Sequence, residues 1–240
     1  MTSSIWPEVF DDGLTLDVMP DADALTARCA SWIAATLTAA SDNHARCVLA
    51  ISGGRSPWPM FRRLASDSSV PWSQVHIVQV DERIAPLGHA DRNWTQAAEV
   101  FGAVLPPEQL HPMPVEDEDL VSACGRYAEL IQSLADDAAL CIAHLGLGAD
   151  GHTASLFPND SILDVNDQVV ALTARLHGGR RRMSLTYRGL SQFSHVFWHI
   201  QGAEKSDMLS QLLAAHNSIP ATKVRRDNAH VMADDAAMGL

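Results

Sequence analysis

The chain has 240 residues, of which 47% are hydrophobic and 19% are charged, and this composition indicates a folded globular protein rather than a disordered one. Its 17 basic residues against 29 acidic ones leave a formal net charge of −12, which argues against a nucleic-acid or anionic-membrane partner because such partners need a basic patch. An anionic ligand must therefore be bound locally, by a small number of residues.

Cysteine spacing and the length of apolar runs indicate the compartment in which the protein works. The four cysteines form no Cys-x-x-Cys pair, so we expect small buried thiols rather than a zinc site or a disulfide framework: Cys29, Cys47, Cys124 and Cys141. No signal-peptide segment follows Met1, and no apolar run approaches the roughly 18 residues of a membrane span. We expect a cytoplasmic protein that is a monomer or a weak homo-oligomer, since it is acidic and only 6% aromatic.

Strand and helix patterns alternate along the chain. Five apolar runs rich in β-branched or aromatic residues predict strands at 47–51, 75–80, 139–147, 169–172 and 195–200. Longer segments with helical spacing lie between several of these runs. The apolar residues among 25–37 share one face of a helix that begins at the acidic residues 21–23, and further helices are expected at about 58–64 and 120–134.

This alternation predicts an α/β fold, with a mostly parallel, Rossmann-like sheet covered by helices on both faces. The Pro-rich stretch 105–114 and the Gly/Arg-rich stretch 177–182 are expected to be long loops, and neither is biased enough to be an interdomain linker. Residues 1–240 should therefore form a single domain. Ligands of open α/β sheets bind beyond the carboxyl ends of the strands, so the loops that follow the strands are the candidate site.

The first such loop, SGGRSP at 52–57, precedes a predicted helix. Two adjacent glycines, Gly53 and Gly54, let the backbone approach a ligand closely, and the helix N-terminus offers unpaired N–H groups. These features indicate a phosphate cradle with Arg55 and Ser56 beside it. A plain strand–helix turn capped by Ser56 fits the loop equally well. No Lys follows as in a nucleotide-binding P-loop, so ATP is not implied.

The second loop, DERIAPLGHADRNW at 81–94, places a charged triplet directly after an apolar run. Carboxylates at a strand end cost desolvation energy unless they are used or paired. Arg83 therefore either holds a phosphate or pairs with Asp81 or Glu82, and the ion pair is the simpler explanation of this loop alone.

The third loop, LGLGADGHTASLFP at 145–158, combines glycines with a histidine at a strand end. Gly146, Gly148 and Gly151 allow a positive φ or a close approach. His152 carries a side chain whose unperturbed pKa, about 6.5, lets it take and return a proton near neutrality. An incidental histidine is the alternative, but the glycine framing and the strand-end position favour a catalytic role.

Two further segments carry positive charge. The segment GGRRRMSLT at 178–186 either is a solvated charge run or brings one arginine, Arg182, to a phosphate. The segment GAEK follows the run 195–200, so Lys205 begins the next helix beside the same crevice, although a surface lysine would look the same from the sequence.

Missing motifs narrow the chemistry. The chain has no Gly-x-Ser-x-Gly nucleophile elbow and no His-Glu-x-x-His zinc helix. His195 and His199 are four residues apart but lie on a predicted strand, where metal binding is not expected. A hydrolase of this kind would need no metal or cofactor and would activate water directly with a general base.

Taken in order, the motifs SGGRSP, VDERIAP with DRN, LGLGADGHTASLFP, RMSLT and GAEK resemble those of the 6-phosphogluconolactonases of the oxidative pentose phosphate pathway. The resemblance covers nearly the whole chain. It implies hydrolysis of 6-phospho-D-glucono-1,5-lactone to 6-phosphogluconate, without a metal or cofactor. The wider superfamily contains glucosamine-6-phosphate deaminase/isomerase, which has the same fold and the same DGH triplet.

Two features separate this chain from the deaminase pattern. Residues 154–158 continue ASLFP, as in the lactonases, where deaminases have an Ala-Phe-Asn-Glu-Pro-like run. Arg83 also matches the lactonases, since deaminases carry an aromatic residue there. The open alternatives are a deaminase/isomerase-type enzyme, which would release ammonia from glucosamine 6-phosphate, and a non-catalytic sugar-phosphate binding module.

The resemblance assigns roles to specific residues. His152 is the general base, and Asp150 either orients its imidazole or only stabilises the turn. The family usually has Ser or Thr at Arg55 and Ser at Arg92, so hydroxyl contacts to the ligand are replaced at these positions. The residues expected to bind the sugar phosphate are Gly53, Gly54, Arg55, Ser56, Asp81, Arg83, Asn93, Arg182 and Lys205.

Overall fold

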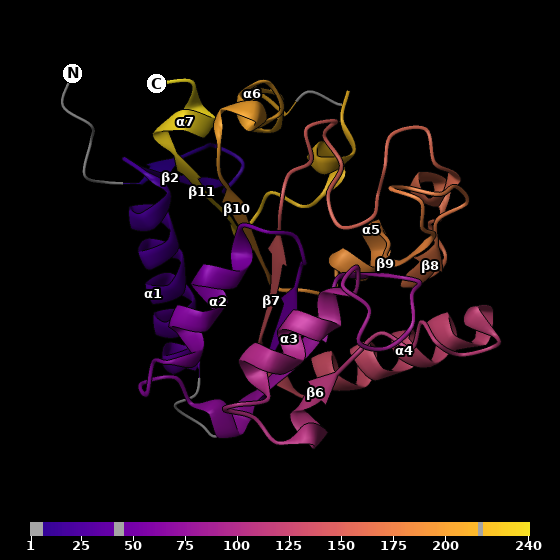
Figure 1. The fold of residues 1–240 in the computed structure, drawn as a ribbon. Helices are drawn as coiled ribbons and strands as arrows, with labels where there is room; N and C mark the ends of the chain where they lie inside the picture. The colour runs from indigo at the N-terminus through magenta and orange to yellow at the C-terminus, as the bar shows by residue number, and fades with distance from the viewer. Residues whose placement is uncertain (1–6, 41–45, 216–217) are drawn as a thin grey trace.

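The computed structural model describes residues 7–40, 46–215 and 218–240. Its framework is an eight-stranded sheet in which every neighbouring pair is parallel except β1 with β2. In sheet order the strands are β1 (Glu8–Val9), β2 (Thr15–Met19), β11 (Ala229–Asp234), β10 (His195–Ile200), β7 (Ala138–Leu145), β3 (Arg46–Ile51), β4 (Val75–Gln79) and β6 (Leu110–His111). Figure 1 shows strands β2, β11, β10 and β7 of this sheet beside helices α1 (Ala22–Ala40) and α2 (Pro57–Ala65).

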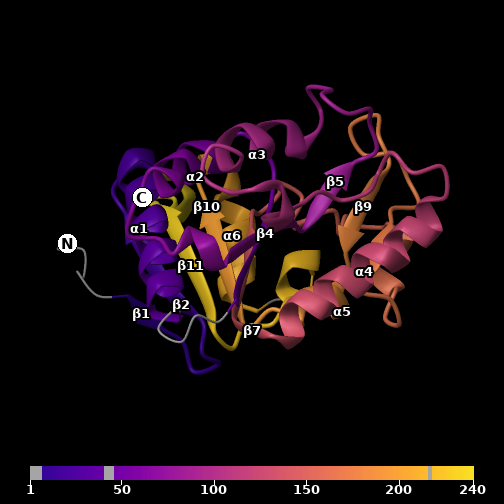
Figure 2. The same ribbon diagram turned by 90° about the horizontal axis from the view of Figure 1, so that it is seen from below.

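Each face of the sheet carries its own apolar core, because successive side chains of a strand point to opposite faces. In β3, Leu49 and Ile51 belong to one core, whereas Val48 and Ala50 belong to the other. Figure 2 shows the first three helices along one side of the sheet and α4 on the other. The helices of the first side are α1 (Ala22–Ala40), α2 (Pro57–Ala65) and α3 (Asn93–Phe101), and those of the second are α4 (Leu120–Asp136), α5 (Tyr187–Leu190), α6 (Ser206–Leu213) and α7 (Asp235–Met238).

A second, antiparallel sheet of three strands stands beside the main one. Its order is β5 (Asp81–Arg83), β9 (Arg182–Leu185) and β8 (Val170–Leu172). Val80 joins the two sheets, because its N–H donates to Ile51 of β3 and its carbonyl accepts from Leu185 of β9. The strand expected at 169–172 therefore forms, but it belongs to this small sheet and not to the parallel one.

The two longest helices, α1 and α4, begin at capping residues. Asp21 Oδ1 accepts the N–H of Ala24 at 2.8 Å at the start of α1, and the Asp119 carboxylate accepts the N–H groups of Val121 and Ser122 at 3.1 Å at the start of α4. Both predicted helices therefore begin within two residues of the expected positions. The described residues also form short 3-10 helices: η2 (Trp72–Gln74), η3 (Pro107–Gln109), η4 (Ser161–Asp164), η5 (Ala203–Lys205) and η6 (Pro220–Lys223).

The cysteines and the helix lengths agree with the sequence analysis. All four cysteines are buried and free, so the prediction of small buried thiols is confirmed. Within the three described ranges, no helix is both long enough and apolar enough to cross a membrane.

The middle of the main sheet fixes where ligand-binding loops gather. Four adjacent parallel strands, β10, β7, β3 and β4, end at the same edge. The segments after them carry the GAEK, DGH, SGGRSP and DER motifs in that spatial order. DER, expected in a loop, forms strand β5 of the small sheet. The motifs that lie far apart in the sequence are thus neighbours at one edge of the sheet.

Candidate active site

A cleft of about 800 Å³ opens at the carboxyl ends of these four strands. It brings together all but one of the residues expected in the site: Gly53, Gly54, Arg55, Ser56, Asp81, Arg83, Asn93, His152, Arg182 and Lys205. Asp150 is the exception, because it does not line the cleft but contacts His152.

The geometry of His152 is set by Asp150. Asp150 Oδ1 lies 2.5 Å from Nδ1 of the imidazole and also accepts the His152 backbone N–H at 3.2 Å. An ionised carboxylate only accepts hydrogen bonds, so the Nδ1 proton is the donor and the lone pair of the neutral ring is on Nε2. Burial alone would raise the pKa of Asp150, but the hydrogen bonds and charge of His152 outweigh it and hold that pKa below its usual value.

Close backbone approach explains part of the glycine framing. A Cβ at Gly148 would lie 2.1 Å from His152 Nδ1 and 2.7 Å from Asp150 Oδ1, so only glycine leaves room for the pair. Gly151 has a φ of +80° and packs against Ile219. Gly146 has neither a positive φ nor a neighbour within 4 Å of an added Cβ, so the expectation for this glycine is wrong.

The SGGRSP loop meets the end of β3 and the start of α2. A Cβ at Gly53 would lie 1.8 Å from Asn93 Oδ1, so this glycine lets the DRN segment pack against the loop. Ser56 stands before α2, but its side chain makes no capping hydrogen bond, and Pro57 occupies the start of the helix. Capping by the Ser56 side chain is therefore wrong, and both Ser56 and Arg55 line the cleft instead.

Two buried histidines lie behind this loop, and sequence reasoning assigned no role to either. The Ser52 N–H donates to His144 Nδ1 at 3.3 Å, and Ser52 Oγ donates to the His144 carbonyl at 2.8 Å. The ring of His199, which lines the cleft, lies 6.2 Å from that of His144. Burial lowers the pKa of His199 to about 4 and that of His144 well below its usual value, so both rings are neutral at pH 7.

Asp81 ties the second motif to the third. Its Oδ2 accepts a hydrogen bond from Ser155 Oγ at 2.6 Å, and its carbonyl accepts from Asn93 Nδ2 at 3.1 Å. Ser155 belongs to the ASLFP segment that follows His152. The residues that distinguish the lactonase pattern in the sequence are therefore in direct contact with the DER triplet.

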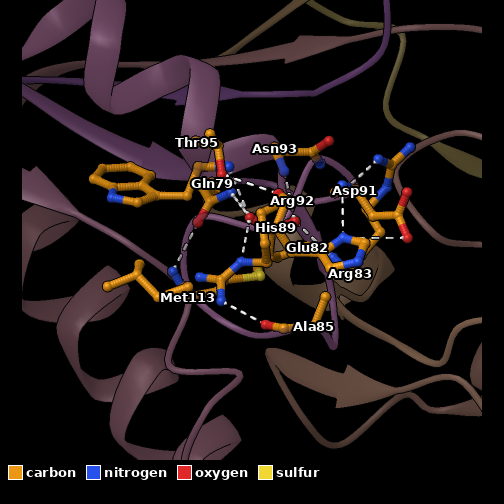
Figure 3. Close-up of polar contacts among 12 residues, drawn as sticks. Gln79, Glu82, Arg83, Ala85, His89, Asp91, Arg92, Asn93, Thr95 and Met113 are labelled. Atoms are coloured by element: carbon orange, nitrogen blue, oxygen red, sulfur yellow. Dashed lines mark hydrogen bonds and ion pairs between the residues drawn. The ribbon is translucent and has the colours of Figure 1, made fainter.

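Glu82 has a structural role, as Figure 3 shows. Its carboxylate is fully buried and accepts the backbone N–H groups of Asn93 and Trp94, at 2.9 and 2.8 Å, at the N-terminus of α3. Arg92 Nε lies 3.2 Å from Glu82 Oε2, and Arg92 Nη1 donates to the Ala85 carbonyl. Where the family usually has Ser, this chain thus has a buried arginine that is not among the residues lining the cleft.

The ion pair expected between Arg83 and Asp81 or Glu82 is wrong. Arg83 Nη1 donates instead to the carbonyl of Asp91 at 2.7 Å (Figure 3). Arg92 takes the place beside Glu82, because the turn from β5 to α3 brings it back against the buried carboxylate. Arg83 consequently faces the cleft without an acidic partner within ion-pair distance among the described residues.

Two arginines lie side by side on adjacent strands of the small sheet. Arg83 of β5 is paired with Arg182 of β9 in the antiparallel register. Burial, and then the charge of Arg83, lower the pKa of the Arg182 guanidinium, although an arginine keeps its charge in proteins. Like charges directly opposite one another destabilise a strand pair, so an anion bound beside them would relieve this repulsion.

Lys205 completes the cationic side of the cleft. It ends η5 immediately before α6, close to the helix start expected from the sequence. Its Nζ lies 4.0 Å from Glu204 Oε1, so the lysine is only loosely paired. In the described part of the chain, no group of three or more His, Cys, Asp or Glu side chains is arranged to hold a metal ion.

One residue of the cleft wall lies in a segment that the sequence showed only as a Gly/Arg-rich loop. His177 lines the cleft, and its Nε2 lies 2.9 Å from the buried carboxylate of Asp160. No local pattern pairs a histidine with an aspartate 17 residues earlier, so only the fold reveals this contact.

Comparisons with known proteins agree with this arrangement. A family model for glucosamine-6-phosphate isomerases/6-phosphogluconolactonases matches residues 20–233. A 6-phosphogluconolactonase of Nostoc sp. is 31% identical over 207 residues, which are 83% of this chain and 85% of that protein. The crystal structure of 6-phosphogluconolactonase from Thermotoga maritima superposes with a TM-score of 0.81 at 26% identity, covering 91% of this chain and 98% of the other.

The fold alone does not separate the two activities of this family. A monomeric glucosamine-6-phosphate deaminase superposes with a TM-score of 0.80 at 18% identity, covering 94% of this chain and 99% of the other. The distinction therefore depends on the residues of the cleft.

Proposed function

The chain belongs to the glucosamine-6-phosphate isomerase/6-phosphogluconolactonase family, and we propose that it hydrolyses 6-phospho-D-glucono-1,5-lactone to 6-phosphogluconate in the cytoplasm, with His152 as the general base. One observation carries this proposal. His152, whose imidazole is hydrogen-bonded to Asp150, lines the same cleft as the opposed arginines Arg83 and Arg182. A proton-transferring group and a binding site for a phosphate dianion are thus within one cleft.

His152 serves both halves of the reaction. Its Nε2 takes a proton from water as the water oxygen attacks the lactone carbonyl carbon, C1. The tetrahedral intermediate then collapses with cleavage of the bond between C1 and the ring oxygen, and the imidazolium returns the proton to that oxygen. Asp150 holds the proton on Nδ1 and stabilises the imidazolium, as the carboxylate of a catalytic triad does.

The 6-phosphate is bound at the cationic side of the cleft. Arg83, Arg182 and Lys205 supply charge, and the backbone N–H groups around Gly53 and Gly54 at the N-terminus of α2 supply further donors. Arg55 adds a charge-assisted hydrogen bond where the family usually has a hydroxyl. Because the phosphate does not react, these groups contribute mainly to substrate affinity.

The residues beside His152 favour the lactone over an amino sugar phosphate. Ser155, of the ASLFP segment, donates to Asp81, and Arg83 stands where a deaminase has an aromatic residue. The Nostoc relative, at 31% identity, is a 6-phosphogluconolactonase. A binding module without activity would have no need for a general base held by a carboxylate.

A timed assay of lactone hydrolysis tests the function. The protein should open 6-phospho-D-glucono-1,5-lactone far faster than the spontaneous background, should do so equally well after treatment with a chelator, and should release no ammonia from glucosamine 6-phosphate. Ammonia release would identify a deaminase. Binding of 6-phosphogluconate without faster lactone opening would identify a binding module, and loss of activity with the chelator would contradict the metal-free mechanism.

A further inference from the structure

A row of three rings extends from the proposed general base into the cleft wall. The ring centroids of His152 and Phe157 lie 4.3 Å apart, with their planes inclined by 36°. Phe157 also stacks on His177, with centroids 3.7 Å apart and planes inclined by only 8°. Phe157 is therefore in contact with both imidazoles.

Asp160 fixes the far end of this row. Its fully buried carboxylate accepts hydrogen bonds from His177 Nε2 at 2.9 Å and from the backbone N–H groups of Ala174 and Arg175 at 3.0 Å. Burial would raise the pKa of Asp160, but these hydrogen bonds, with that from Ile162, lower it to about 2. The ionised carboxylate thus organises the loop at 173–177 and sets the orientation of the His177 ring.

The same loop is linked to the cationic side of the cleft. The His177 carbonyl accepts from Arg182 Nη2 at 2.7 Å, and the His177 N–H donates to the Arg180 carbonyl at 2.8 Å. The His177 side chain is only 18% exposed. Its ring is therefore held by the protein on several sides and provides a fixed surface for Phe157.

We propose that His177 is a positioning residue for the lactone hydrolysis assigned above. Asp150 holds one edge of the His152 imidazole through Nδ1, but a hydrogen bond at one edge leaves the ring free to tilt about it. Phe157 supports the face of that ring, and the ring of residue 177, on a loop that Asp160 holds through the backbone N–H groups of Ala174 and Arg175, supports Phe157. A misplacement of about 1 Å in a reacting group lowers a rate by up to about 10²-fold, so the support acts on turnover.

Two substitutions at one position separate the stack from the hydrogen bond. His177→Ala removes both the ring and the bond to Asp160, whereas His177→Phe removes the bond but keeps a ring to stack on Phe157. We expect kcat to fall about 10-fold in H177A with KM changed less than about 2-fold, and to stay within about 2-fold of the wild type in H177F. Both variants lose the same hydrogen bond, so equal losses of thermal stability would not explain a difference in kcat.

A double-mutant cycle tests whether His177 acts on His152 through Phe157. Phe157→Leu should lower kcat to a similar extent, and adding H177A to F157L should have little further effect, because the two residues act through one contact. His195→Ala is the matched histidine control. His195 begins β10, at the end of the strand away from the cleft, so this variant should leave kcat unchanged.

A spectroscopic readout is independent of turnover. The His152 ring protons, assigned in the NMR spectrum by their loss in H152Q, should carry a ring-current shift from Phe157 that decreases in H177A and is kept in H177F. If the wild type did not hydrolyse the lactone, the proposed function would be wrong. The shifts would still show whether Phe157 and His177 support the His152 ring, so the two failures are distinguishable. The positioning role would be overturned if H177A kept the wild-type kcat or the wild-type His152 shifts, or if it raised KM alone. It would also be overturned if H177F lost as much kcat as H177A, or if the effects of F157L and H177A on kcat were additive.

Discussion

Gly148 shows how a single residue without a side chain determines where the proposed catalytic group can lie. The His152 imidazole and the Asp150 carboxylate occupy the space into which any Cβ at position 148 would project. The hydrogen bond between the two side chains therefore depends on this glycine as much as on either of them.

Gly148→Ala should lower kcat by about 10- to 100-fold, because the added methyl group displaces the imidazole by a fraction of its own width. Steady-state kinetics would measure the loss. Gly125→Ala, in open space on α4, is the control and should leave kcat unchanged. Wild-type kcat in G148A would mean that the pair tolerates displacement and that its geometry is not critical.

Ten of the eleven residues that the sequence placed in the site line the cleft, but the contacts of their side chains could not be predicted. Strand ends and glycine-rich loops indicated His152, Asp81 and the SGGRSP loop, because such loops gather at one edge of a parallel sheet. The partner of Glu82 was missed, since Arg92 reaches it only through the turn into α3. His177 was missed because its contacts with Asp160 and Phe157 exist only in the folded chain.

At the scale of elements, the antiparallel pair of β5 and β9 sets two positive charges opposite each other. Arg182→Met keeps most of the apolar stem and removes the charge. We expect KM for the lactone to rise about 10-fold or more with a smaller change in kcat, and the rise in melting temperature caused by 6-phosphogluconate to shrink. Arg188→Met, on the exposed face of α5, is the control, and an unchanged KM in R182M would remove Arg182 from the phosphate site.

The N-terminus of α3 depends on a buried acid. Glu82→Gln leaves the Arg92 guanidinium, only 2% exposed, with Glu116 as its remaining acidic neighbour, 3.9 Å from Nη1. The free energy of unfolding should fall by about 3 kcal/mol, the low end of the cost of breaking a buried ion pair, because the half-exposed Glu116 only partly compensates the buried charge. Chemical denaturation would measure this against Glu99→Gln, an exposed residue of the same helix. A change below about 1 kcal/mol in E82Q would contradict the role assigned to the pair.

Strands were predictable only where their apolar runs are continuous. The runs in β3, β4, β7 and β10 were recognised and differ from the structure by at most two residues at either end. The outer strand β2 was missed because Asp17 interrupts it, and this charge is stabilised by Arg28 of α1 at 2.8 Å. The sequence pattern does not show that Arg28 pairs with Asp17.

The small sheet was not predicted, because its strands pair segments that are far apart in the sequence.

At the scale of the whole molecule, the two cores are coupled through the strands they share. Residues of β3, β7, β10 and β11 contribute to both cores in alternation. We predict that the chain unfolds as a single domain, in one calorimetric transition with a ratio of calorimetric to van't Hoff enthalpy of about 1. Two separate transitions, or a stable fragment containing one core alone, would show that the chain divides into independent units.

The proposed catalysis depends above all on one imidazole at the edge of the sheet, beside a binding site for a phosphate. The most direct measurement is the turnover of His152→Ala, together with its affinity for 6-phosphogluconate and with H195A as control. Positioned base catalysis contributes about 10²- to 10⁴-fold, so kcat for the lactone should fall by that factor while the Kd of the product changes less than about 3-fold. A kcat close to the wild-type value in H152A would contradict the assignment of His152 as the base. So would a weaker affinity for 6-phosphogluconate with kcat unchanged.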